Sequence, residues 1–493
     1  MSDKQNNQNP VNSMNSSRKV RVRFAPSPTG YLHIGNIRMA LFNYMFAKRH
    51  NGKFILRIED TDFVRSKKEF EQAIREDLAW LGIATDEGAE VSGEFGPYRQ
   101  SERLDIYTSF ANQLLEKSKA YRCYCTEEEL EIHRKKALAC GTAPHYDNRC
   151  RNLTQEDIER FEKEGRSYCL RFKLPQKRLS FDDSIRGHIE FDTDLLGDPV
   201  IVKSDGIPTY HFAVVIDDSM MKITHVIRGE GHISNTAIHL ALFEELGYPV
   251  PQFAHMSHTK GLSKRLGSKS IRDFRNEGYV PEAIINYCAL LGWSSKDGSE
   301  KFDPREKATE FELEDSKRSA NTFDEKKFDW LCKQYMKDVS IEQLIPMITK
   351  YLPENISSDS DKIYKVAEAF KTSSPAKASE ITEIIDIFED SNLAYLPETI
   401  SEISKVESVQ VLKELVTELE MSRDALSVEQ FLAVVKLVGK RTNLKGKALY
   451  HPMRLALTNR ESGPELVALI PAMGRNLMIR RIKNAISVST EHS

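Results

Sequence analysis

The sequence has no long apolar run, few cysteines and no excess of one charge sign. None of its apolar runs approaches the ~20 residues that a membrane-spanning helix needs, so we expect no membrane partner. Seven cysteines in 493 residues do not make a disulfide framework, and their odd number indicates a reducing, cytoplasmic environment. With 70 basic and 73 acidic residues the formal net charge is -3, so general attraction to DNA is not expected.

What the sequence does contain is enough apolar material for several domains. Hydrophobic residues make up 40% and charged residues 29% of the chain, as in globular proteins, and the length suggests two to four domains. Residues 1–17 are the exception, because they are rich in Asn, Gln and Ser. They lack the apolar core of a secretory signal and the arginines of a mitochondrial presequence, so we interpret them as a disordered tail.

Strand and helix patterns alternate after this tail. Residues 20–24 alternate apolar and basic side chains like a strand, and the prolines and glycine of 25–30 end that pattern. Helical spacing over 34–50, a β-rich run over 54–58 and a second helix over 69–81 follow. This rhythm predicts an α/β fold with a doubly wound, Rossmann-type parallel sheet.

The rest of the chain divides by composition. The stretch 105–205 is charged and holds five of the seven cysteines, which indicates an insert, and the α/β rhythm resumes at Pro208. Helical spacing dominates from about residue 310, with a linker expected near 337–344. We therefore expect a tail (1–17), a first Rossmann half (18–104), an insert (105–205), a second half (206–260), a basic loop with the region after it (261–338) and a helical region (339–493).

The string Pro26–Asn36 lies between the first strand and the first helix, where α/β sheets bind ligands. A helix N-terminus there offers N–H groups to phosphate. Gly30 and Gly35 allow close approach, while His33 and Asn36 supply donors for a phosphate or a sugar hydroxyl. The alternative is a rigid turn with a structural histidine.

A second glycine-containing loop, Lys260–Ser268, is basic. Lys264 and Arg265 are suited to neutralising a polyphosphate, and Gly261 and Gly267 allow the loop to move. The alternative is an ordinary solvated basic loop.

Together the two strings resemble the HIGH and KMSKS signatures of class I aminoacyl-tRNA synthetases, in particular the bacterial glutamyl branch. Asn36 replaces the last histidine of the first signature, and Gly261 stands where the second usually has lysine, but Ser263 and Lys264 are intact. The resemblance implies four catalytic residues: His33, Ser263, Lys264 and Arg265. It implies an ATP site made of Pro26, Thr29, Gly30, His33, Gly35, Asn36, Gly261, Leu262, Ser263 and Lys264.

A glutamate pocket needs cations for the side-chain carboxylate and an anion for the α-amino group. Arg23 and Arg228 supply planar guanidinium groups, Glu59 supplies the anion, and Tyr210 can form a wall. The alternatives are strand-end ion pairs and a core tyrosine. The resemblance implies a glutamate site made of Arg23, Ala25, Ser27, Glu59, Tyr210 and Arg228. Val214 and His232 stand where some members have asparagine and tryptophan; we keep only His232 as a candidate.

The insert carries Cys123, Cys125 and Cys150. Some members of the family continue this pattern with histidine, but here Asn152 occupies that place and is a poor zinc ligand. Tyr146, His145 or Cys140 could substitute. We expect a degenerate site held by packing, and predict no bound metal.

Charge is polarised in the helical region. Residues 380–430 hold thirteen acidic and three basic side chains, and residues 431–486 hold eleven basic and two acidic ones. The basic segment is a candidate tRNA surface, with a solvated helical face as the alternative. Its candidate residues are Lys436, Lys440, Arg441, Lys445, Lys447, Arg454, Arg475, Arg480, Arg481 and Lys483.

The resemblance implies ATP-dependent activation of L-glutamate, with Mg²⁺ held by ATP, and transfer to the terminal adenosine of tRNA(Glu). tRNA(Gln) remains open as a second acceptor, and a monomer is expected. By resemblance, the insert binds the acceptor end and the helical region binds the anticodon. The rivals are a glutaminyl enzyme, which would carry β-barrel anticodon domains, a truncated tRNA-modifying paralogue, a general nucleotidyltransferase and a non-catalytic RNA-binding relative.

Overall fold

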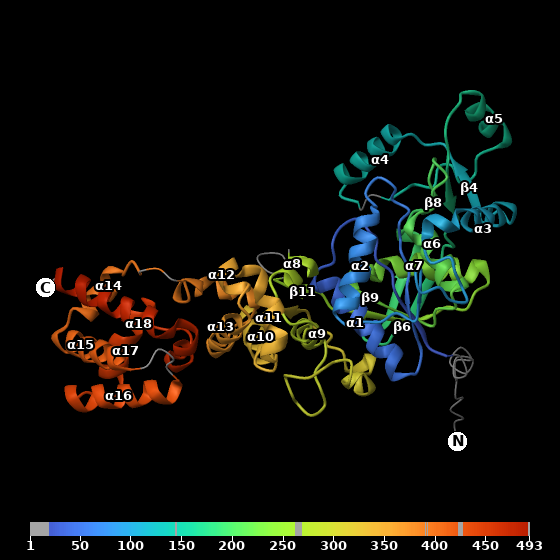
Figure 1. The fold of residues 1–493 in the computed structure, drawn as a ribbon. Helices are drawn as coiled ribbons and strands as arrows, with labels where there is room; N and C mark the ends of the chain where they lie inside the picture. The colour runs from blue at the N-terminus through green and yellow to red at the C-terminus, as the bar shows by residue number, and fades with distance from the viewer. Residues whose placement is uncertain are drawn as a thin grey trace, which may run out of the picture. The chain divides into compact units, whose positions relative to one another are not determined.

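The computed structural model describes residues 19–142, 145–261, 269–389, 391, 393–422 and 427–491 (Figure 1). The expected tail and the loop residues Leu262, Ser263, Lys264 and Arg265 lie outside these ranges. The chain forms two compact units, Met1–Arg272 with Ile284–Asp324 and Asp273–Ala283 with Glu325–Ser493. Across the described residues, no helix has the length and apolar character needed to cross a membrane.

The first half of unit 1 is a parallel β-α-β arrangement, as predicted. Its elements are β1 (Arg21–Phe24), α1 (Ile34–Arg49), β2 (Lys53–Leu56), α2 (Lys68–Trp80) and β3 (Glu87–Gly88). β2 lies between β1 and β3, with Arg21 opposite Lys53 and Phe24 opposite Leu56. Apolar and basic side chains alternate along β1, but its last three residues are all buried because both faces of the strand are covered, and α1 packs on β1 and β2.

The second half belongs to a sheet of four strands, two of which, β6 and β7, lie within the range 105–205 that we expected to form the insert. Its elements are β6 (Arg178–Asp183), β7 (Gly187–Asp192), α6 (Tyr210–Met220), β9 (His225–Gly229), α7 (Ile233–Leu246) and β10 (Gln252–Met256). β10 runs parallel to both β9 and β6, while β7 pairs antiparallel with β6. The backbone N–H of Thr224 donates to the Arg21 carbonyl at 2.9 Å, which joins β9 to β1. The carboxyl ends of β1, β2, β9 and β10 therefore lie along one edge, which is where α/β sheets bind ligands.

The core under α6 and α7 is apolar. Phe212 and Val215 of α6 and Leu242 of α7 pack against Val226 and Phe253 of the sheet. Two aspartates, Asp217 and Asp218, interrupt this face of α6 and are buried. Burial of adjacent carboxylates requires partners, which the site supplies.

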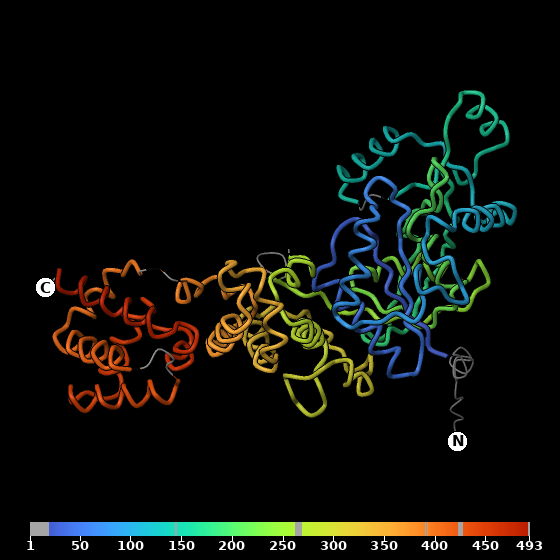
Figure 2. The backbone as a smooth tube through the Cα atoms, viewed as in Figure 1, coloured from blue at the N-terminus to red at the C-terminus, as the bar shows by residue number. Residues whose placement is uncertain are grey.

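The insert is a separate antiparallel layer within unit 1. It contains α3 (Leu104–Glu116), β4 (Ala120–Cys123), α4 (Glu127–Ala139), α5 (Gln155–Lys163), β5 (Cys169–Phe172) and β8 (Val200–Val202). Figure 2 shows this teal-to-green segment leaving the α/β core and returning to it. Thr126 and Thr154 cap α4 and α5 through capping boxes with Glu129 and Asp157.

Two-residue strands β11 (Thr259–Lys260) and β12 (Asn321–Thr322) pair beside the basic loop, and α8 (Ile271–Asn276) and α9 (Pro281–Leu290) follow that loop.

Unit 2 is helical over its described residues, as expected. Its helices are α10 (Glu325–Met336), α11 (Ile341–Ile348), α12 (Glu354–Ser357), α13 (Ser360–Thr372), α14 (Pro397–Ile403), α15 (Val406–Met421), α16 (Val428–Thr442), α17 (Lys447–Thr458) and α18 (Leu466–Glu491).

Candidate active site

His33 begins α1 as its N-cap and is exposed. Its Nδ1 accepts the Gly35 backbone N–H at 3.1 Å, and its own backbone N–H donates to Asn36 Oδ1 at 3.1 Å. A neutral His33 therefore carries its ring proton on Nε2, which is available for a phosphate oxygen. A Cβ on Gly35 would lie 2.9 Å from the His33 ring, so this cap requires glycine. The cap therefore engages the Gly35 backbone N–H and the side-chain Oδ1 of Asn36 within the protein.

The turn before α1 is tied to the end of β2. The Pro26 carbonyl accepts the Glu59 backbone N–H at 3.1 Å, and the Ser27 carbonyl accepts the Thr29 N–H at 2.9 Å. Ser27 and Thr29 are exposed, and Ala25 and Gly30 are half-buried. The predicted ATP residues and the predicted glutamate residue Glu59 thus share one edge of the sheet.

Both described ends of the basic loop are anchored in unit 1. Lys260 pairs with Thr322, and Gly261 has a φ of +83°, a left-handed conformation that suits glycine. After the loop, Ser270 forms an antiparallel bridge with His33, and the Ile271 N–H donates to the Leu32 carbonyl at 2.8 Å. The residues that follow the second string therefore contact the first string, whereas Leu262, Ser263, Lys264 and Arg265 lie outside the described residues.

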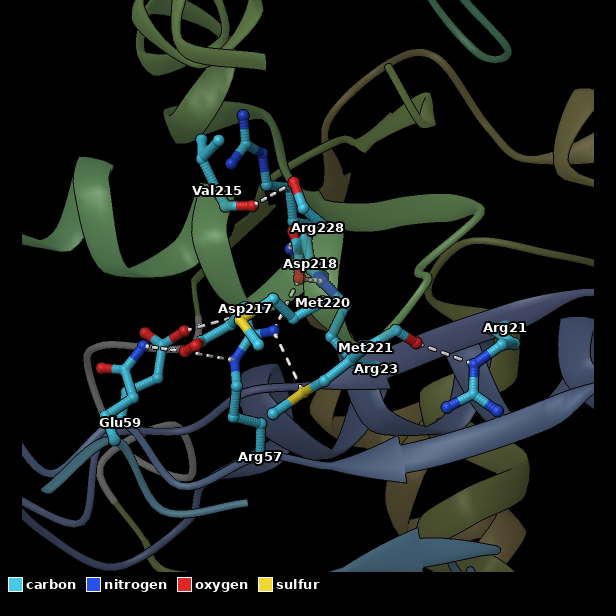
Figure 3. Close-up of polar contacts among 12 residues, drawn as sticks. Arg21, Arg23, Arg57, Glu59, Val215, Asp217, Asp218, Met220, Met221 and Arg228 are labelled. Atoms are coloured by element: carbon cyan, nitrogen blue, oxygen red, sulfur yellow. Dashed lines mark hydrogen bonds and ion pairs between the residues drawn. The ribbon is translucent and has the colours of Figure 1, made fainter. Parts of the chain in front are cut away.

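One group of buried charges, here called the carboxylate cluster, consists of Arg23, Arg57, Glu59, Asp217 and Asp218 (Figure 3). Arg23 donates to both Asp218 oxygens at 3.0 and 3.3 Å. Arg57 donates to Asp218 at 2.6 Å and to Glu59 at 3.2 Å, and lies 3.7 Å from Asp217. Every guanidinium in this cluster therefore has a carboxylate partner.

The pKa values in this cluster follow burial and pairing. Burial alone would raise the pKa of Asp218, but Arg23 and Arg57 bring it below its usual value, so Asp218 is ionised. Burial raises the pKa of Glu59, against the opposing effect of Arg57 and Arg23.

Arg23 was predicted to bind substrate, and the structure shows that Asp218 already balances its charge. Within the described chain its Nη1 has no protein hydrogen-bond partner and is open to a ligand.

The second group, here called the imidazole cluster, surrounds Arg228 at the end of β9 and contains His211, His232, His239 and His255. Arg228 is 7% exposed, and its five N–H donors all have neutral partners. Nε donates to His255 Nε2 (3.1 Å), Nη1 to His239 Nδ1 (3.2 Å) and the Tyr210 hydroxyl (3.4 Å), and Nη2 to Thr236 Oγ1 (2.8 Å) and the His232 carbonyl (3.2 Å).

In the described part of the chain, no carboxylate forms an ion pair with Arg228. Burial accordingly lowers the pKa of Arg228, and the nearby positive charge of Arg23 lowers it further, although Asp218 and Tyr210 oppose the effect. A buried cation without a direct counter-ion is costly unless an anion arrives. This end of β9 is therefore suited to binding a small carboxylate.

Tyr210 and His232 form the accessible side of this pocket. Tyr210 is 37% exposed, and its hydroxyl lies 3.4 Å from His232 Nδ1. Val214, which stands where some members have asparagine, is 1% exposed on α6. Sequence reasoning missed Asp183, Asp218, His239 and His255, and the signal for Asp218 was two adjacent acids in an otherwise apolar helix.

The insert brings three thiols together. The Sγ atoms of Cys123, Cys125 and Cys150 lie within 4.8 Å of one another. The Tyr146 hydroxyl lies 3.3 Å from Cys123 Sγ and 3.8 Å from Cys125 Sγ, and Asn152 is exposed. Three thiols and a phenol would suit a tetrahedral zinc ion. The absence of a metal stays a prediction, and metal analysis of the purified protein tests it.

The basic segment of unit 2 is partly structural. Arg481 is fully buried and donates to the carbonyls of Leu457, Asp386 and Glu389. Arg441 of α16 pairs with Glu414 and Glu418 of α15 at 3.1 and 2.7 Å. The acidic and basic segments therefore neutralise each other in part. The candidate basic residues that are exposed are Lys436, Lys440, Arg441, Lys445, Lys447, Arg480 and Lys483.

The parallel sheet with its insert, and the capped helix that begins beside the carboxyl ends of the strands, agree with the fold of class I aminoacyl-tRNA synthetases. The model of the class I tRNA synthetase (E and Q) catalytic domain matches residues 19–330, and that of an anticodon binding domain matches residues 341–486. The chain belongs to this family.

Curated proteins that are similar to this chain include glutamate–tRNA ligases. That of Desulforamulus reducens is 42% identical over 479 residues, which cover 95% of this chain and 99% of the relative. That of Bacillus subtilis strain 168 is 41% identical over 480 residues, covering 94% and 99%. The crystal structure of a glutamate tRNA ligase from Elizabethkingia meningosepticum, in complex with its amino acid, is 36% identical with a TM-score of 0.84, covering 95% and 99%.

Proposed function

We propose that the protein activates L-glutamate with ATP and transfers the glutamyl group to the 3′-terminal adenosine of tRNA(Glu). We infer the amino acid from Arg228, which is buried and forms no ion pair with any described carboxylate. The side-chain carboxylate of glutamate would supply the missing negative charge, and Nη1 of Arg23 adds a donor beside it. The neutral amide of glutamine would leave that charge unbalanced.

In the first step the α-carboxylate of glutamate attacks the α-phosphate of ATP, and pyrophosphate leaves. Negative charge grows on the phosphate oxygens, so catalysis needs positioned donors and no protein nucleophile. His33 supplies an Nε2–H at the start of α1, and we assign the main transition-state contact to Lys264, with Ser263 and Arg265 beside it. Glu59 would hold the α-amino group of the substrate, next to the Pro26 turn.

The magnesium ion would arrive with ATP. The segment Pro26–Asn36 contains no carboxylate, so it does not form a protein cage for a metal ion. Mg²⁺ bound to the phosphates would neutralise their charge, and the residues of this segment would hold and orient the nucleotide. We further propose a monomeric enzyme that works in the cytoplasm, where its product enters translation.

Charging assays test this function. Purified protein is incubated with labelled glutamate, ATP and either tRNA(Glu) or tRNA(Gln). Charging of tRNA(Glu) alone identifies a discriminating enzyme, and charging of both identifies a relaxed one whose second product needs an amidating partner. Charging of tRNA(Gln) alone identifies a specialised paralogue. Charging of neither overturns the proposal and favours a non-catalytic RNA-binding relative.

A further inference from the structure

An aspartate and two histidines that lie outside the sequence motifs hold the guanidinium of Arg228. We propose that Asp183, His255 and His239 are positioning residues, which fix the orientation of Arg228 and thereby set the affinity for glutamate. The inference rests on the proposed function, because it deepens the role given there to Arg228.

His255 is placed by the sheet itself. In the parallel pairing of β9 and β10, His255 lies directly opposite Arg228. Its side chain is fully buried, and its Nδ1 lies 2.6 Å from Asp183 Oδ2 of β6. Asp183 also accepts the backbone N–H groups of Ile185, Arg186 and His255. Asp183, His255 and Arg228, which come from three strands, therefore form one chain of hydrogen bonds.

Only one arrangement of protons on Asp183 and His255 satisfies the hydrogen bonds that join them to Arg228. Burial alone would raise the pKa of Asp183, but the hydrogen bond from His255 and those from the backbone bring it below its usual value. An ionised Asp183 only accepts, so His255 must donate from Nδ1. Burial lowers the pKa of His255 and keeps it neutral, which leaves a lone pair on Nε2 for the Nε–H of Arg228.

His239 completes the arrangement on the other side of the guanidinium. Its Nδ1 lies 3.2 Å from Arg228 Nη1, and its Nε2 lies 3.2 Å from His211 Nδ1. Because Nδ1 accepts from Arg228, the ring proton of His239 is on Nε2 and points to His211. His239 is 2% exposed, so solvent does not compete for these bonds.

This arrangement leaves one side of the guanidinium easy to reach. The longest of the five contacts is that of Nη1 with the Tyr210 hydroxyl at 3.4 Å, and Tyr210 is 37% exposed, whereas His239, the other partner of Nη1, is 2% exposed. A substrate carboxylate therefore approaches Nη1 beside Tyr210, while His255 and His239 hold the other donors in place. The carboxylate would replace the Tyr210 hydroxyl at Nη1, while the other four N–H donors keep their partners and hold the guanidinium in place.

Two variants of His255 separate its two hydrogen bonds. In His255→Gln the amide oxygen reaches the position of Nε2 and still accepts from Arg228. In His255→Asn the shorter amide reaches the position of Nδ1, so it keeps the contact with Asp183 and loses Arg228. We measure KM for glutamate, KM for ATP and kcat in tRNA charging at saturating tRNA, and expect the Asn variant to raise the glutamate KM about tenfold. The Gln variant should stay within about threefold of wild type, with kcat and the ATP KM little changed in both.

A purely structural role would instead lower the active fraction and kcat, and leave the glutamate KM unchanged in both variants. That result overturns the inference, as does an equal increase in the two variants. His239→Leu gives an independent check, with a raised glutamate KM expected again. Arg228→Leu is measured alongside: if it leaves the glutamate KM unchanged, the proposed pocket itself fails, whereas a raised KM in Arg228→Leu with normal His255 and His239 variants refutes only the positioning role.

Discussion

The carboxylate cluster and the imidazole cluster both bury arginines in unit 1, but they balance the charge differently. Arg57 is fully buried and contacts three carboxylates, whereas the hydrogen bonds of Arg228 to described residues go to imidazoles, hydroxyls and a carbonyl. In the first arrangement every guanidinium already has a carboxylate partner, and Arg57 joins the residues after β2 to α6. In the second, no described carboxylate balances the charge of Arg228, and we propose that the substrate anion does so. A buried arginine therefore indicates a binding site through its partners rather than through its burial.

Removing Arg57 should give the largest loss of stability. Arg57→Met would leave Asp217, Asp218 and Glu59 buried with too few positive charges, and we expect the free energy of unfolding to fall by about 3–5 kcal/mol. Urea unfolding at pH 7.5 measures it. Arg228→Leu is the matched control and should cost less than about 2 kcal/mol, because it removes an unbalanced charge. Equal losses in the two variants would contradict the comparison.

The same Arg228→Leu variant should have the largest effect on activity. Loss of the buried cation leaves the substrate carboxylate unpaired, and we expect kcat/KM for glutamate to fall by about 100-fold or more. The ATP KM should stay close to that of wild type. A parallel loss for both substrates would indicate a general disturbance and would remove Arg228 from the glutamate pocket.

Glu59 tests whether the carboxylate cluster also serves the substrate. Glu59→Gln keeps the shape and removes the negative charge proposed for the α-amino group, so the glutamate KM should rise about tenfold. Arg57 keeps its contacts with Asp217 and Asp218, so unfolding should change little. If stability falls and the glutamate KM does not move, Glu59 is only part of the structural cluster.

The two clusters should also differ in their response to pH. Burial and the nearby Arg228 lower the pKa values of His239 and His255, whereas the unfolded chain takes up these protons near pH 6.5. Stability should therefore fall as the pH drops below about 6.5. Asp218, whose pKa is lowered, contributes stability that is lost only below its unfolded value near 3.8.

Urea unfolding midpoints at pH 7.5, 6.0 and 5.0 measure this effect, which is the smallest of the four predicted effects. The matched variant is again Arg228→Leu, in which the histidines lose their positive neighbour and titrate closer to their usual range. Its midpoint should decline less than that of wild type over this window. Identical declines would show that other groups account for the acid sensitivity.

Much of this site could be predicted locally. The turn residues of Pro26–Gly30 and the cap at His33 place the start of α1 at Ile34, as expected. Arg23, Glu59 and Arg228 each lie at or near the end of a short β-rich run, and parallel strands bring such ends to one edge.

The partners could not be predicted, because they come from distant parts of the chain. Asp183 and His255 are 72 residues apart, and Arg23 and Asp218 are 195 apart. Nothing local shows that Arg481 is buried among backbone carbonyls while Lys440 is exposed. Burial depends on packing between helices, which a run of basic residues in the sequence does not reveal.

The most direct test of the central claim compares glutamate with glutamine, which has the same shape without the charge. The ratio of kcat/KM for the two amino acids is measured in tRNA charging by the wild-type protein, Arg228→Leu and Arg228→Gln. If Arg228 recognises the side-chain carboxylate, wild type favours glutamate strongly and both variants lose most of that preference. An unchanged preference in the variants would contradict the account and place the recognition of glutamate elsewhere.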